Sequence, residues 1–498
     1  MNSLVLELTD KCNLKCKYCY YGDRNDKNMV IKQEVVDELV SFMRRDNGND
    51  SNANHFYIDF IGGEPLLSFD MMRYVVDKFK TPDIANRFKI KYRLTTNGTI
   101  IDEDIIFFLK KENISIVISL DGDRESHDAC RIFNNGKGSY NEVINNLKII
   151  EDNGIIYDVR ATITKKTMAY DKLSVFFNKL NVASFGLMPA VFNDNKNIEY
   201  QLDEVDVKEL GKNMLKEFEQ NIMSGIISKN SVLLNIFSKI IFDKKSLYPC
   251  NAGITYFGIG SDGYIYPCHR FFGLREYSIG HVSKNIDYDK LSNIAGISVD
   301  KRVTCSNCDI RYYCGGTCYY ESLVKMHDIS SIEHLTCVLS QVLIKGVIKI
   351  IINLQRLDKN LLMNIITDLN ISPDGESNKK IDKLEFSVIK MTEDIYVDKN
   401  NITDKVYIKS AGVYSIDLED EGIIYKIDTT DKIIANLSAM VIFDLIDSIN
   451  TAKKIVEIVA SISDKRFVDL EDDIYRQLII FQHLGYIEEV NNVEKANT

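Results

Sequence analysis

The chain has 498 residues, 45% of them hydrophobic, and a formal net charge of −11 at pH 7. This length allows two to four domains with a sizeable core, and the acidic balance argues against a general nucleic-acid or anionic-membrane surface. No apolar run approaches the roughly 20 residues of a transmembrane helix, and the N-terminus lacks the basic and apolar regions of a signal peptide. We therefore expect a cytoplasmic protein without membrane or nucleic-acid partners.

Strand-like and helix-like runs alternate over the first 190 residues. Apolar runs predict six strands, at 4–8, 56–61, 90–95, 114–120, 155–163 and 183–188. Helical periodicity between them predicts helices, for example at 32–43, 70–79, 103–110, 140–151 and 170–179. Six βα units favour a parallel sheet curled into a partial barrel, because crossovers between parallel strands are right-handed. Sites in such barrels lie at the carboxyl ends of the strands.

Three cysteines, Cys12, Cys16 and Cys19, follow the first predicted strand at the spacing C-x3-C-x2-C. Soft thiolates favour zinc or iron–sulfur centres. A structural zinc site has four ligands, but the next Cys or His along the chain is His55. Three thiolates on a four-iron cluster would leave one iron free for an outside ligand.

This loop resembles that of the radical S-adenosylmethionine (SAM) superfamily, down to the aromatic Tyr18 before the third cysteine. In that family the amino and carboxylate groups of SAM bind the free iron. The reduced cluster then cleaves SAM, and the resulting 5′-deoxyadenosyl radical abstracts a hydrogen atom from the substrate. The resemblance implies that Cys12, Cys16 and Cys19 hold the catalytic [4Fe–4S] cluster; a structural zinc loop is the alternative.

Small and polar residues follow the next three predicted strands. Gly62, Gly63, Glu64 and Pro65 match the family's GGEP motif, which holds the amino group of SAM, and two glycines permit close backbone approach to a ligand. Thr96 and Asn97 end the third strand and Ser119 the fourth, where the family contacts the ribose and carboxylate of SAM. Arg131 completes a pattern of SLDG, HD and arginine, and we expect it to pair with a carboxylate of SAM or substrate. Turns, helix caps and a surface arginine are the alternatives.

A second cysteine-rich region follows residues 196–248, whose two helical patterns at 205–224 and 231–242 suggest a bridge. Seven cysteines fall within 88 positions: Cys250, Cys268, Cys305, Cys308, Cys314, Cys318 and Cys337. Their spacing, C-x12-G-x4-C, then C-x2-C-x5-C-x3-C, then C, is that of the SPASM domain, which carries two auxiliary [4Fe–4S] clusters. A pair of zinc sites is the alternative, with the eighth ligand drawn from His269, His281, His327 or His334.

The resemblance also implies how these cysteines are shared. One auxiliary cluster is held completely by Cys305, Cys308, Cys314 and Cys337, and the other by Cys250, Cys268 and Cys318. Some relatives supply a fourth cysteine to the second cluster at the position of Tyr256, so its fourth site is expected to be open. His269 stands where the sulfatase-maturing branch has a catalytic aspartate, which disfavours that activity. The remaining cysteine, Cys130, is expected to be a buried small apolar residue.

The C-terminal part begins with an apolar, helical stretch at 336–369 and a linker at 373–378. Strands are predicted at 413–416, 423–427 and 433–437, and helices at 438–449, 452–462 and 470–484. With the closing residues 485–489, this order resembles a PqqD-like recognition domain, in which a peptide leader adds a strand to a sheet edge. A DNA-binding winged helix is disfavoured, because residues 401–498 hold 10 Lys and Arg against 18 Asp and Glu, a net charge of −8.

These patterns predict an α/β chain of five parts. They are a TIM-like (β/α)6 radical SAM partial barrel at 1–195, a helical bridge at 196–248, a SPASM domain at 249–340, a helix and linker at 341–380, and a PqqD-like α+β domain at 381–498. The resemblance implies three [4Fe–4S] clusters, SAM, a precursor peptide and a flavodoxin- or ferredoxin-type electron donor.

The favoured activity is the formation of intrapeptide thioether crosslinks from a cysteine to a carbon. Carbon–carbon crosslinking comes second and sulfatase-type formylglycine maturation third. A non-catalytic iron–sulfur redox or regulatory protein would account for the clusters but not for the GGEP and SLDG loops.

Overall fold

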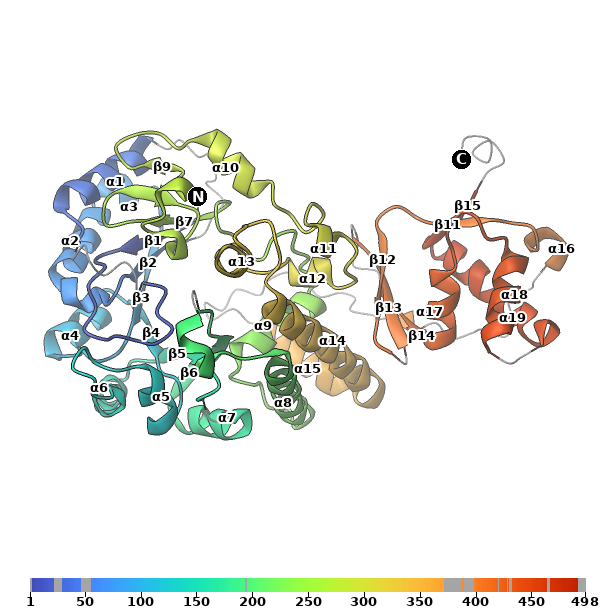
Figure 1. Cartoon of the computed structure of the whole chain (residues 1–498), viewed down its shortest axis with the longest axis horizontal. Helices are drawn as coiled ribbons and strands as arrows, with labels where there is room; N and C mark the ends of the chain where they lie inside the picture. Colours follow the sequence, from blue (N-terminus) through green and yellow to red (C-terminus); the bar gives the residue numbers. More distant parts are fainter. Residues whose placement is uncertain are drawn as a thin grey trace. The chain divides into compact units, whose positions relative to one another are not determined.

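The computed structural model of the chain is shown in Figure 1. It describes residues 2–21, 29–45, 55–167, 169–192, 195–370, 387–388, 398–419, 421–427, 429, 432–463 and 466–490. The chain divides into two compact units. The first comprises Met1–Phe237 and Ser246–Val347, and the second comprises Ser238–Lys245 and Ile348–Thr498.

A parallel sheet forms the centre of the first unit. Its six N-terminal strands are β1 (Ser3–Glu7), β2 (Phe56–Ile61), β3 (Ile90–Thr96), β4 (Ser115–Ser119), β5 (Tyr157–Ile163) and β6 (Val182–Pro189). They pair in chain order, and each neighbouring pair is parallel. Strand β6 lies at one end of the described sheet and does not pair with β1, so the barrel is open. The predicted (β/α)6 partial barrel is therefore confirmed as a fold.

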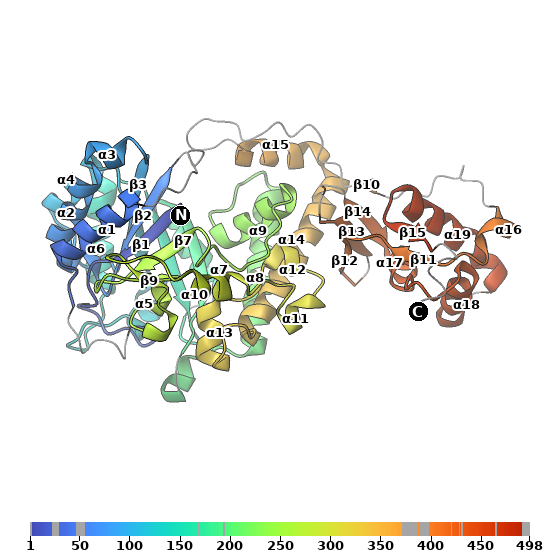
Figure 2. The ribbon, with the colours of Figure 1, turned by 90° about the horizontal axis from the view of Figure 1, so that it is seen from above.

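Helices cover the outer face of this sheet (Figure 2). They are α1 (Gln33–Arg45), α2 (Phe69–Phe79), α3 (Pro82–Ala85), α4 (Glu103–Lys111), α5 (Arg124–Cys130), α6 (Tyr140–Asp152) and α7 (Tyr170–Lys179). Each long helix turns an apolar stripe toward the strands, as Val36, Leu39 and Val40 do in α1. The short helices α3 and α5 were not predicted, because four or seven residues do not show a helical period.

The second cysteine region continues the same sheet. Strand β7 (Tyr256–Ile259) pairs in parallel with β1, and β8 (Tyr264–Tyr266) and β9 (Gly280–His281) follow it as antiparallel neighbours. The cysteine loops are built on short helices, namely α10 (Tyr288–Ala295), α11 (Val303–Ser306), α12 (Arg311–Cys314) and α13 (Tyr319–Met326), and on the 3-10 turn η3 (His269–Phe271). The region is thus part of the barrel unit, joined to it through the free side of β1.

Four long helices flank this region in the chain. Helices α8 (Glu204–Met223) and α9 (Ser231–Ile241) form the predicted bridge, and α14 (His334–Leu357) and α15 (Lys359–Asn370) form the predicted apolar stretch. Among the described residues, α14 is the one helix long and apolar enough to cross a membrane, with mean hydropathy of 2.0 over its most apolar window. By that measure the expectation of no such segment is wrong, and 44% of the window is buried inside the protein.

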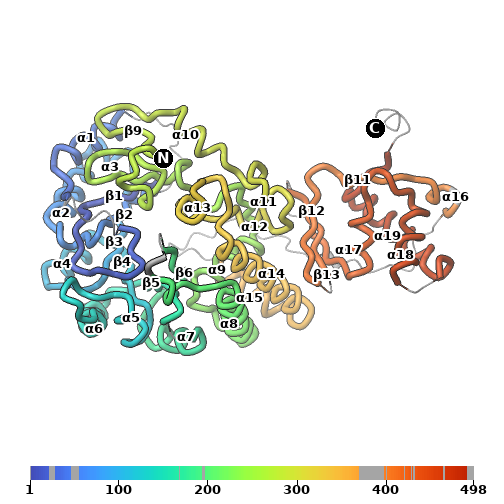
Figure 3. The backbone as a smooth tube through the Cα atoms, viewed as in Figure 1, coloured from blue at the N-terminus to red at the C-terminus, as the bar shows by residue number. Residues whose placement is uncertain are grey.

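Beyond α15, the second unit has a small, mostly antiparallel sheet packed with helices (Figure 3). Strands β12 (Val413–Asp417), β13 (Glu421–Lys426) and β14 (Lys432–Asn436) pair in order, and the two-residue β10 (Ser387–Val388) lies parallel to β14. Helices α17 (Leu437–Asp444), α18 (Ala452–Ile462) and α19 (Phe467–His483) follow, with β11 (Tyr407–Lys409) paired to β15 (Ile487–Glu489) and a short α16 (Lys399–Ile402). The predicted strands and helices are present here, whereas the predicted linker 373–378 lies outside the described residues.

Candidate functional site

The first cysteine loop leaves β1 at its carboxyl end and is held by backbone hydrogen bonds. The Lys15 and Lys17 amides donate to the carbonyls of Ile132 (2.7 Å) and Cys130 (3.1 Å). Cys12, Cys16 and Cys19 are each partly exposed on this loop. Burial, and the charges of Glu64 and of the other thiols, raise the pKa of Cys12 to about 11. The free protein therefore keeps this thiol protonated, and a bound cation would be needed to stabilise its thiolate.

The GGEP loop packs directly beneath the cysteine loop. The amide of Gly63 donates to the carbonyl of Thr9 (2.8 Å), and that of Glu64 to the carbonyl of Lys11 (2.7 Å). A Cβ atom at Gly63 would lie 2.3 Å from the Lys11 carbonyl oxygen, so a larger residue does not fit without displacing the cysteine loop. The two glycines are therefore required for loop-to-loop contact, whatever their contact with a ligand.

Glu64 is fully buried and its carboxylate is used within the chain. One oxygen accepts hydrogen bonds from the Thr96 hydroxyl (2.7 Å) and the Leu66 amide (3.1 Å), and the other accepts from the Asn97 amide (2.7 Å). Burial raises the pKa of this carboxyl from 4.5 to about 7, although the hydrogen bonds oppose the shift. The side chain thus fastens the end of β2 to the end of β3.

Asn97 extends the same network to the cysteine loop. Its side-chain nitrogen donates to the side-chain oxygen of Asn13 (2.9 Å) and lies 3.8 Å from the sulfur of Cys12. Asn13 in turn donates to the Thr99 hydroxyl (2.8 Å). The sequence predicted Asn97 as a ligand contact, and the structure adds that its amide positions the first cysteine.

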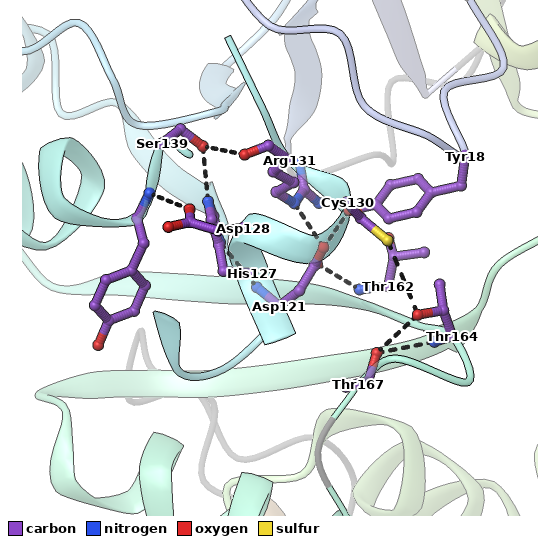
Figure 4. Close-up of polar contacts among 11 residues, drawn as sticks. Tyr18, Asp121, His127, Asp128, Cys130, Arg131, Ser139, Thr162, Thr164 and Thr167 are labelled. Carbon is purple, nitrogen blue, oxygen red and sulfur yellow. Dashed lines mark hydrogen bonds and ion pairs between the residues drawn. The ribbon is translucent and has the colours of Figure 1, made fainter. Parts of the chain in front are cut away.

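A buried polar network joins Tyr18 of the first cysteine loop to Asp121, Arg131 and Thr162 (Figure 4). Asp121 accepts from the hydroxyl of Tyr18, from the Arg131 Nε (2.9 Å) and from the Thr162 amide (2.8 Å). The Arg131 guanidinium lies 5.4 Å from the centroid of the Tyr18 ring. Arg131 is 8% exposed, which contradicts the alternative of a surface arginine. From the sequence, Tyr18 and Asp121 are recognised only as parts of motifs. Their pairing is not predictable locally, because it requires β4 to lie beside the first cysteine loop.

Two further residues of the SLDG–HD pattern support this network. His127 is buried and hydrogen-bonded to the Ser139 hydroxyl (2.9 Å), and burial together with the nearby Arg131 lowers the pKa of its imidazole to about 4. Asp128 caps the next helix by accepting from the Tyr140 amide (2.9 Å). Cys130 is 1% exposed, as predicted for an apolar role. Ser119 ends β4, where it pairs with Arg160 of β5.

The cysteines of the second region form two groups. Four of them line one cavity of about 380 Å³ together with Gln341 of α14: Cys305, Cys308, Cys314 and Cys337. The Gln341 side chain donates to the sulfur of Cys308 (3.1 Å). The four thiols predicted for one ligand set thus face a common space, and Cys318, four residues after Cys314, does not line it.

Cys250, Cys268 and Cys318 form the other group. The charges of Cys250 and Cys318 act on Cys268, and that of Cys318 acts on Cys250. Burial raises the pKa of Cys268 to about 12. Arg270 lies 3.8 Å from the Cys318 sulfur and forms an ion pair with Glu321 (2.6 Å). Tyr256, at the position of a fourth cysteine in some relatives, is hydrogen-bonded to His269 (2.9 Å).

Aromatic contacts join this group to the first cysteine loop. The ring of Tyr20, which follows Cys19, lies 6.0 Å from that of His269 and 6.2 Å from that of Tyr320. The rings of Tyr20 and Tyr320 belong to an apolar cluster that also contains Cys19, Cys268 and Cys318. The first cysteine loop and the three-cysteine group are therefore neighbours in one compact unit. Within the described residues, no three His, Cys, Asp or Glu side chains are close enough to hold a single metal ion.

Comparison with known proteins agrees with the resemblance described from the sequence. The model of the radical SAM superfamily matches residues 6–169. A cysteine-type anaerobic sulfatase-maturating enzyme of Clostridium novyi is 29% identical over 335 residues, which cover 64% of this chain and 87% of that enzyme. The radical SAM cyclopropyl synthase TigE of Paramaledivibacter caminithermalis is 25% identical, over 72% of this chain and 76% of its own.

Two further comparisons extend these findings. The subtilosin biosynthesis protein AlbA of Bacillus subtilis is 25% identical, over 64% of this chain and 67% of its own. Among solved structures, native anSMEcpe with bound AdoMet and a peptide has the same fold, with a TM-score of 0.62 at 20% identity, over 71% of this chain and 98% of that one.

The first site fits the cofactors of this family. Its donors are three thiols on one loop, which suit a four-iron cluster with one open iron. The GGEP loop, Asn97 and Ser119 stand beside it at the carboxyl ends of β2, β3 and β4, where ligands of parallel barrels bind. The donor set, the barrel and the matched family model agree: residues 6–169 are similar to the radical SAM superfamily, and this similarity implies a [4Fe–4S] cluster and SAM as cofactors of this part of the chain.

Proposed function

We propose that the chain is a radical SAM/SPASM enzyme that modifies a ribosomally made precursor peptide, forming thioether crosslinks from a cysteine to a carbon. The observation that carries this proposal is the grouping of ten cysteines into three sets within one compact unit. The named relatives act in sulfatase maturation, subtilosin biosynthesis and cyclopropane formation. These activities support modification of a peptide or protein as the common chemistry.

Cys12, Cys16 and Cys19 would hold the SAM-binding cluster. When bound, that cluster supplies the electron for cleavage of SAM to a 5′-deoxyadenosyl radical, which removes hydrogen from the peptide. The described hydrogen bonds of the Glu64 carboxylate are within the chain, so its role is to fasten the GGEP loop to the end of β3. Contact with the SAM ammonium then falls to Gly62, Gly63 and Pro65 of the same loop.

The remaining predicted SAM contacts are assigned either to SAM, to a partner within the chain, or to both. Ser119, Thr96 and Asn97 stay assigned to SAM, with the latter two also tying β3 to Glu64. Arg131 is bound to Asp121 and stacked near Tyr18. We therefore assign it first to positioning Tyr18 and second to a SAM carboxylate, for which its two terminal nitrogens remain.

The auxiliary cysteines would hold two further clusters. Cys305, Cys308, Cys314 and Cys337 share one cavity and form a complete set. The set of Cys250, Cys268 and Cys318 has three thiols, and Tyr256 is hydrogen-bonded to His269 with a phenol whose pKa burial raises well above its usual range. This phenol is a poor replacement for a fourth thiolate, so the set is suited to an outside thiolate such as a peptide cysteine.

Thioether formation follows from that open position. A peptide cysteine held there would have its sulfur close to the first cysteine loop, because Tyr20 and His269 lie between the two sites. Each link would remove one hydrogen atom from a peptide carbon and one proton from the thiol, form one sulfur–carbon bond, and consume one SAM as 5′-deoxyadenosine. The remaining electron would pass to the cluster that Cys250, Cys268 and Cys318 would hold. A flavodoxin- or ferredoxin-type protein would supply the electron for SAM cleavage.

Formylglycine formation is the second candidate, and one observation favours it. The sulfatase-maturating relative matches over 87% of its own length. Against it stands His269, which follows Cys268 at the position of that branch's aspartate. The C-terminal sheet of strands β12 to β14 is a second argument for the modification of a precursor peptide, because its edge suits recognition of a leader by strand addition.

Mass spectrometry separates the candidates. The reconstituted protein is incubated anaerobically with SAM, a reductant and the cysteine-containing peptide encoded beside its gene. A thioether costs the peptide two hydrogens and protects the cysteine from alkylation, whereas formylglycine loses the sulfur. Crosslinking that continues after every core cysteine is changed to serine would exclude the thioether and favour a carbon–carbon bond.

A further inference from the structure

The inner face of the parallel sheet carries charged side chains. Along β5 the residues Tyr157, Val159, Ala161 and Ile163 are buried, whereas Asp158, Arg160 and Thr162 between them are less buried or exposed. Neighbouring residues of a strand point to opposite faces, and helices cover the outer face of the sheet (Figure 2). Arg160 therefore points into the open barrel, with Asp158 and Thr162 on the same face.

Most charges on this inner face are already balanced by neighbours. Arg93 of β3 stands in register with Asp59 of β2 and forms a two-point ion pair with it. Asp158 accepts a hydrogen bond from the Ser184 hydroxyl (2.7 Å). Arg160 differs, since it has neither a hydrogen bond nor an ion pair of its side chain with any part of the chain that the structure describes.

Two further arginines and the carboxylate of Asp158 lie near Arg160. Partial desolvation by the surrounding protein and the positive charges of Arg93 and Arg270 lower the pKa of its guanidinium, while Tyr256 and Asp158 act in the opposite direction. Arg93 is paired with Asp59, and Arg270 is paired with Glu321 (2.6 Å). Arg160 is thus the guanidinium of this group that has no ion pair among the described residues, and it lies between three strands of the barrel and the loop of the three-cysteine set.

We propose that Arg160 binds a carboxylate side chain of the peptide substrate inside the barrel, an assignment that rests on the proposed function of the same site. A guanidinium matches a carboxylate in two-point hydrogen bonding and in charge. Arg160 pairs in register with Ser119 at the carboxyl end of β4, and Arg270 contacts Cys318. An acidic residue held here lies between the SAM site and the auxiliary cysteines, next to the peptide carbon that reacts.

The carboxylate of SAM is the other candidate ligand for the Arg160 guanidinium, because it has the same charge and hydrogen-bonding groups as an acidic side chain. The charged neighbours of Arg160 are on β3, β5 and η3, and the phenol of Tyr256 is on β7. These elements line the barrel interior and the auxiliary loop, not the first cysteine loop. This placement favours the peptide over SAM, and the two sources give different results in the experiment.

The test uses the reconstituted full-length protein and a mixture of synthetic peptides. Each peptide has the form acetyl-Gly-Gly-Xaa-Gly-Cys-Gly-Gly-amide, with Glu, Asp, Gln or Asn as Xaa, so that the capped ends contribute no carboxylate. Peptides retained by the protein on anaerobic ultrafiltration are quantified by mass spectrometry. We expect the wild type to retain the acidic peptides about tenfold better than their amides.

Three variants complete the design. Arg160→Gln should abolish the acid-to-amide preference, and Arg160→Lys should keep part of it because the charge remains. Arg73→Gln, which removes an exposed arginine on helix α2, should behave as the wild type. A wild type with no acid preference, including one that retains no peptide, or a preference that survives in Arg160→Gln, overturns the proposal.

Retention of SAM is measured on the same samples. Unchanged SAM retention in Arg160→Gln is expected, and a loss of about tenfold would assign the carboxylate to SAM and overturn the peptide assignment. Release of 5′-deoxyadenosine by the wild type without peptide tests the proposed function separately. If that release is absent the proposed function fails, while the acid-to-amide ratio still reports on Arg160.

Discussion

Glu64 shows how a motif residue acts at the scale of a single side chain. Its carboxylate fastens two strand ends, and burial raises its pKa from 4.5 to about 7. The folded protein therefore binds this proton more tightly than the unfolded chain does. The corresponding stability is present at pH values below about 4.5 and is lost as the pH rises through about 7, a change of about 3 kcal/mol.

Replacing Glu64 with Gln tests this linkage. The variant cannot ionise, so the unfolding free energy of the wild type minus that of Glu64→Gln should fall as the pH rises from about 5 to about 8. Urea unfolding of both metal-free proteins across that range measures the difference. A difference that does not change with pH would contradict the assignment of a buried, titrating carboxyl.

Asp121 and Arg131 are a second test at this scale. Their ion pair is buried, with side chains that are 1% and 10% exposed. Asp121→Asn leaves the arginine without its counter-charge, and we expect it to cost about 3–5 kcal/mol of unfolding free energy. The double variant Asp121→Asn, Arg131→Gln should cost less than Asp121→Asn alone. Thermal unfolding measured by circular dichroism compares them, and a double variant less stable than the single one would contradict the pairing.

The three N-terminal cysteines give the direct test of the first cluster. Replacing Cys12, Cys16 and Cys19 with Ala should remove one of three [4Fe–4S] clusters after anaerobic reconstitution, because the other seven ligands lie in separate loops. It should also abolish release of 5′-deoxyadenosine. Iron and sulfide analysis measures the first effect and chromatography the second. Tightly bound zinc in place of iron, or cleavage of SAM by the triple variant, would refute the assignment.

At the scale of elements, the site depends on two loops pressed together. A methyl group on Gly63 would lie 2.3 Å from the backbone of Lys11, so Gly63→Ala should displace the first cysteine loop and lower iron binding by the first site. Gly154 has a positive φ of 68° but open space around its Cβ position. Gly154→Ala therefore controls for backbone strain alone. Iron content should fall in the first variant only, and equal content in both would contradict the packing argument.

The predicted strands of the barrel agree with the structure to within a few residues, because each is a local apolar run. The edge that joins the barrel to the auxiliary region was not predictable in this way. Strand β7 is four residues long and pairs with β1, about 250 positions earlier in the chain. Such pairing depends on which side of β1 is free, and that is decided by the order of the other strands.

At the scale of the whole molecule, the second unit is the expected site of leader recognition. Deleting residues 381–498 should weaken binding of the precursor peptide substantially, while SAM cleavage without peptide persists, because the first site lies in the other unit. Binding is measured by anaerobic calorimetry on the full-length and truncated proteins. Unchanged affinity in a truncated protein with full iron content would contradict the assignment.

The deletion has a structural consequence that its control must include. Residues Ser238–Lys245 belong to the second unit although they precede the auxiliary region. There Asp243 forms buried ion pairs with Lys432 (2.6 Å) and Lys245 (2.8 Å). Truncation removes Lys432 and leaves Asp243 with Lys245 as its ion-pair partner. The cluster content and thermal stability of the truncated protein should therefore be compared with those of the full-length protein before its peptide affinity is interpreted.

The sequence by itself determined the features that depend on spacing. Three cysteines within eight positions, the GGEP loop after a strand and seven more cysteines at fixed intervals specify ligand chemistry locally, since thiols on one loop reach one centre. The alternation of apolar runs likewise determined the barrel, because strand and helix periods are properties of short segments.

Only the tertiary structure decided what each polar side chain does. It turned Glu64 inward to Thr96 and Asn97 and paired Arg131 with Asp121. It also left Arg160 without an ion pair among the described residues of the inner face, near Arg93 and Arg270. These partners are 10 to 110 residues apart in the chain, and they meet because strand register and loop packing set their distances. A local pattern contains no information on which charges are neutralised across a barrel.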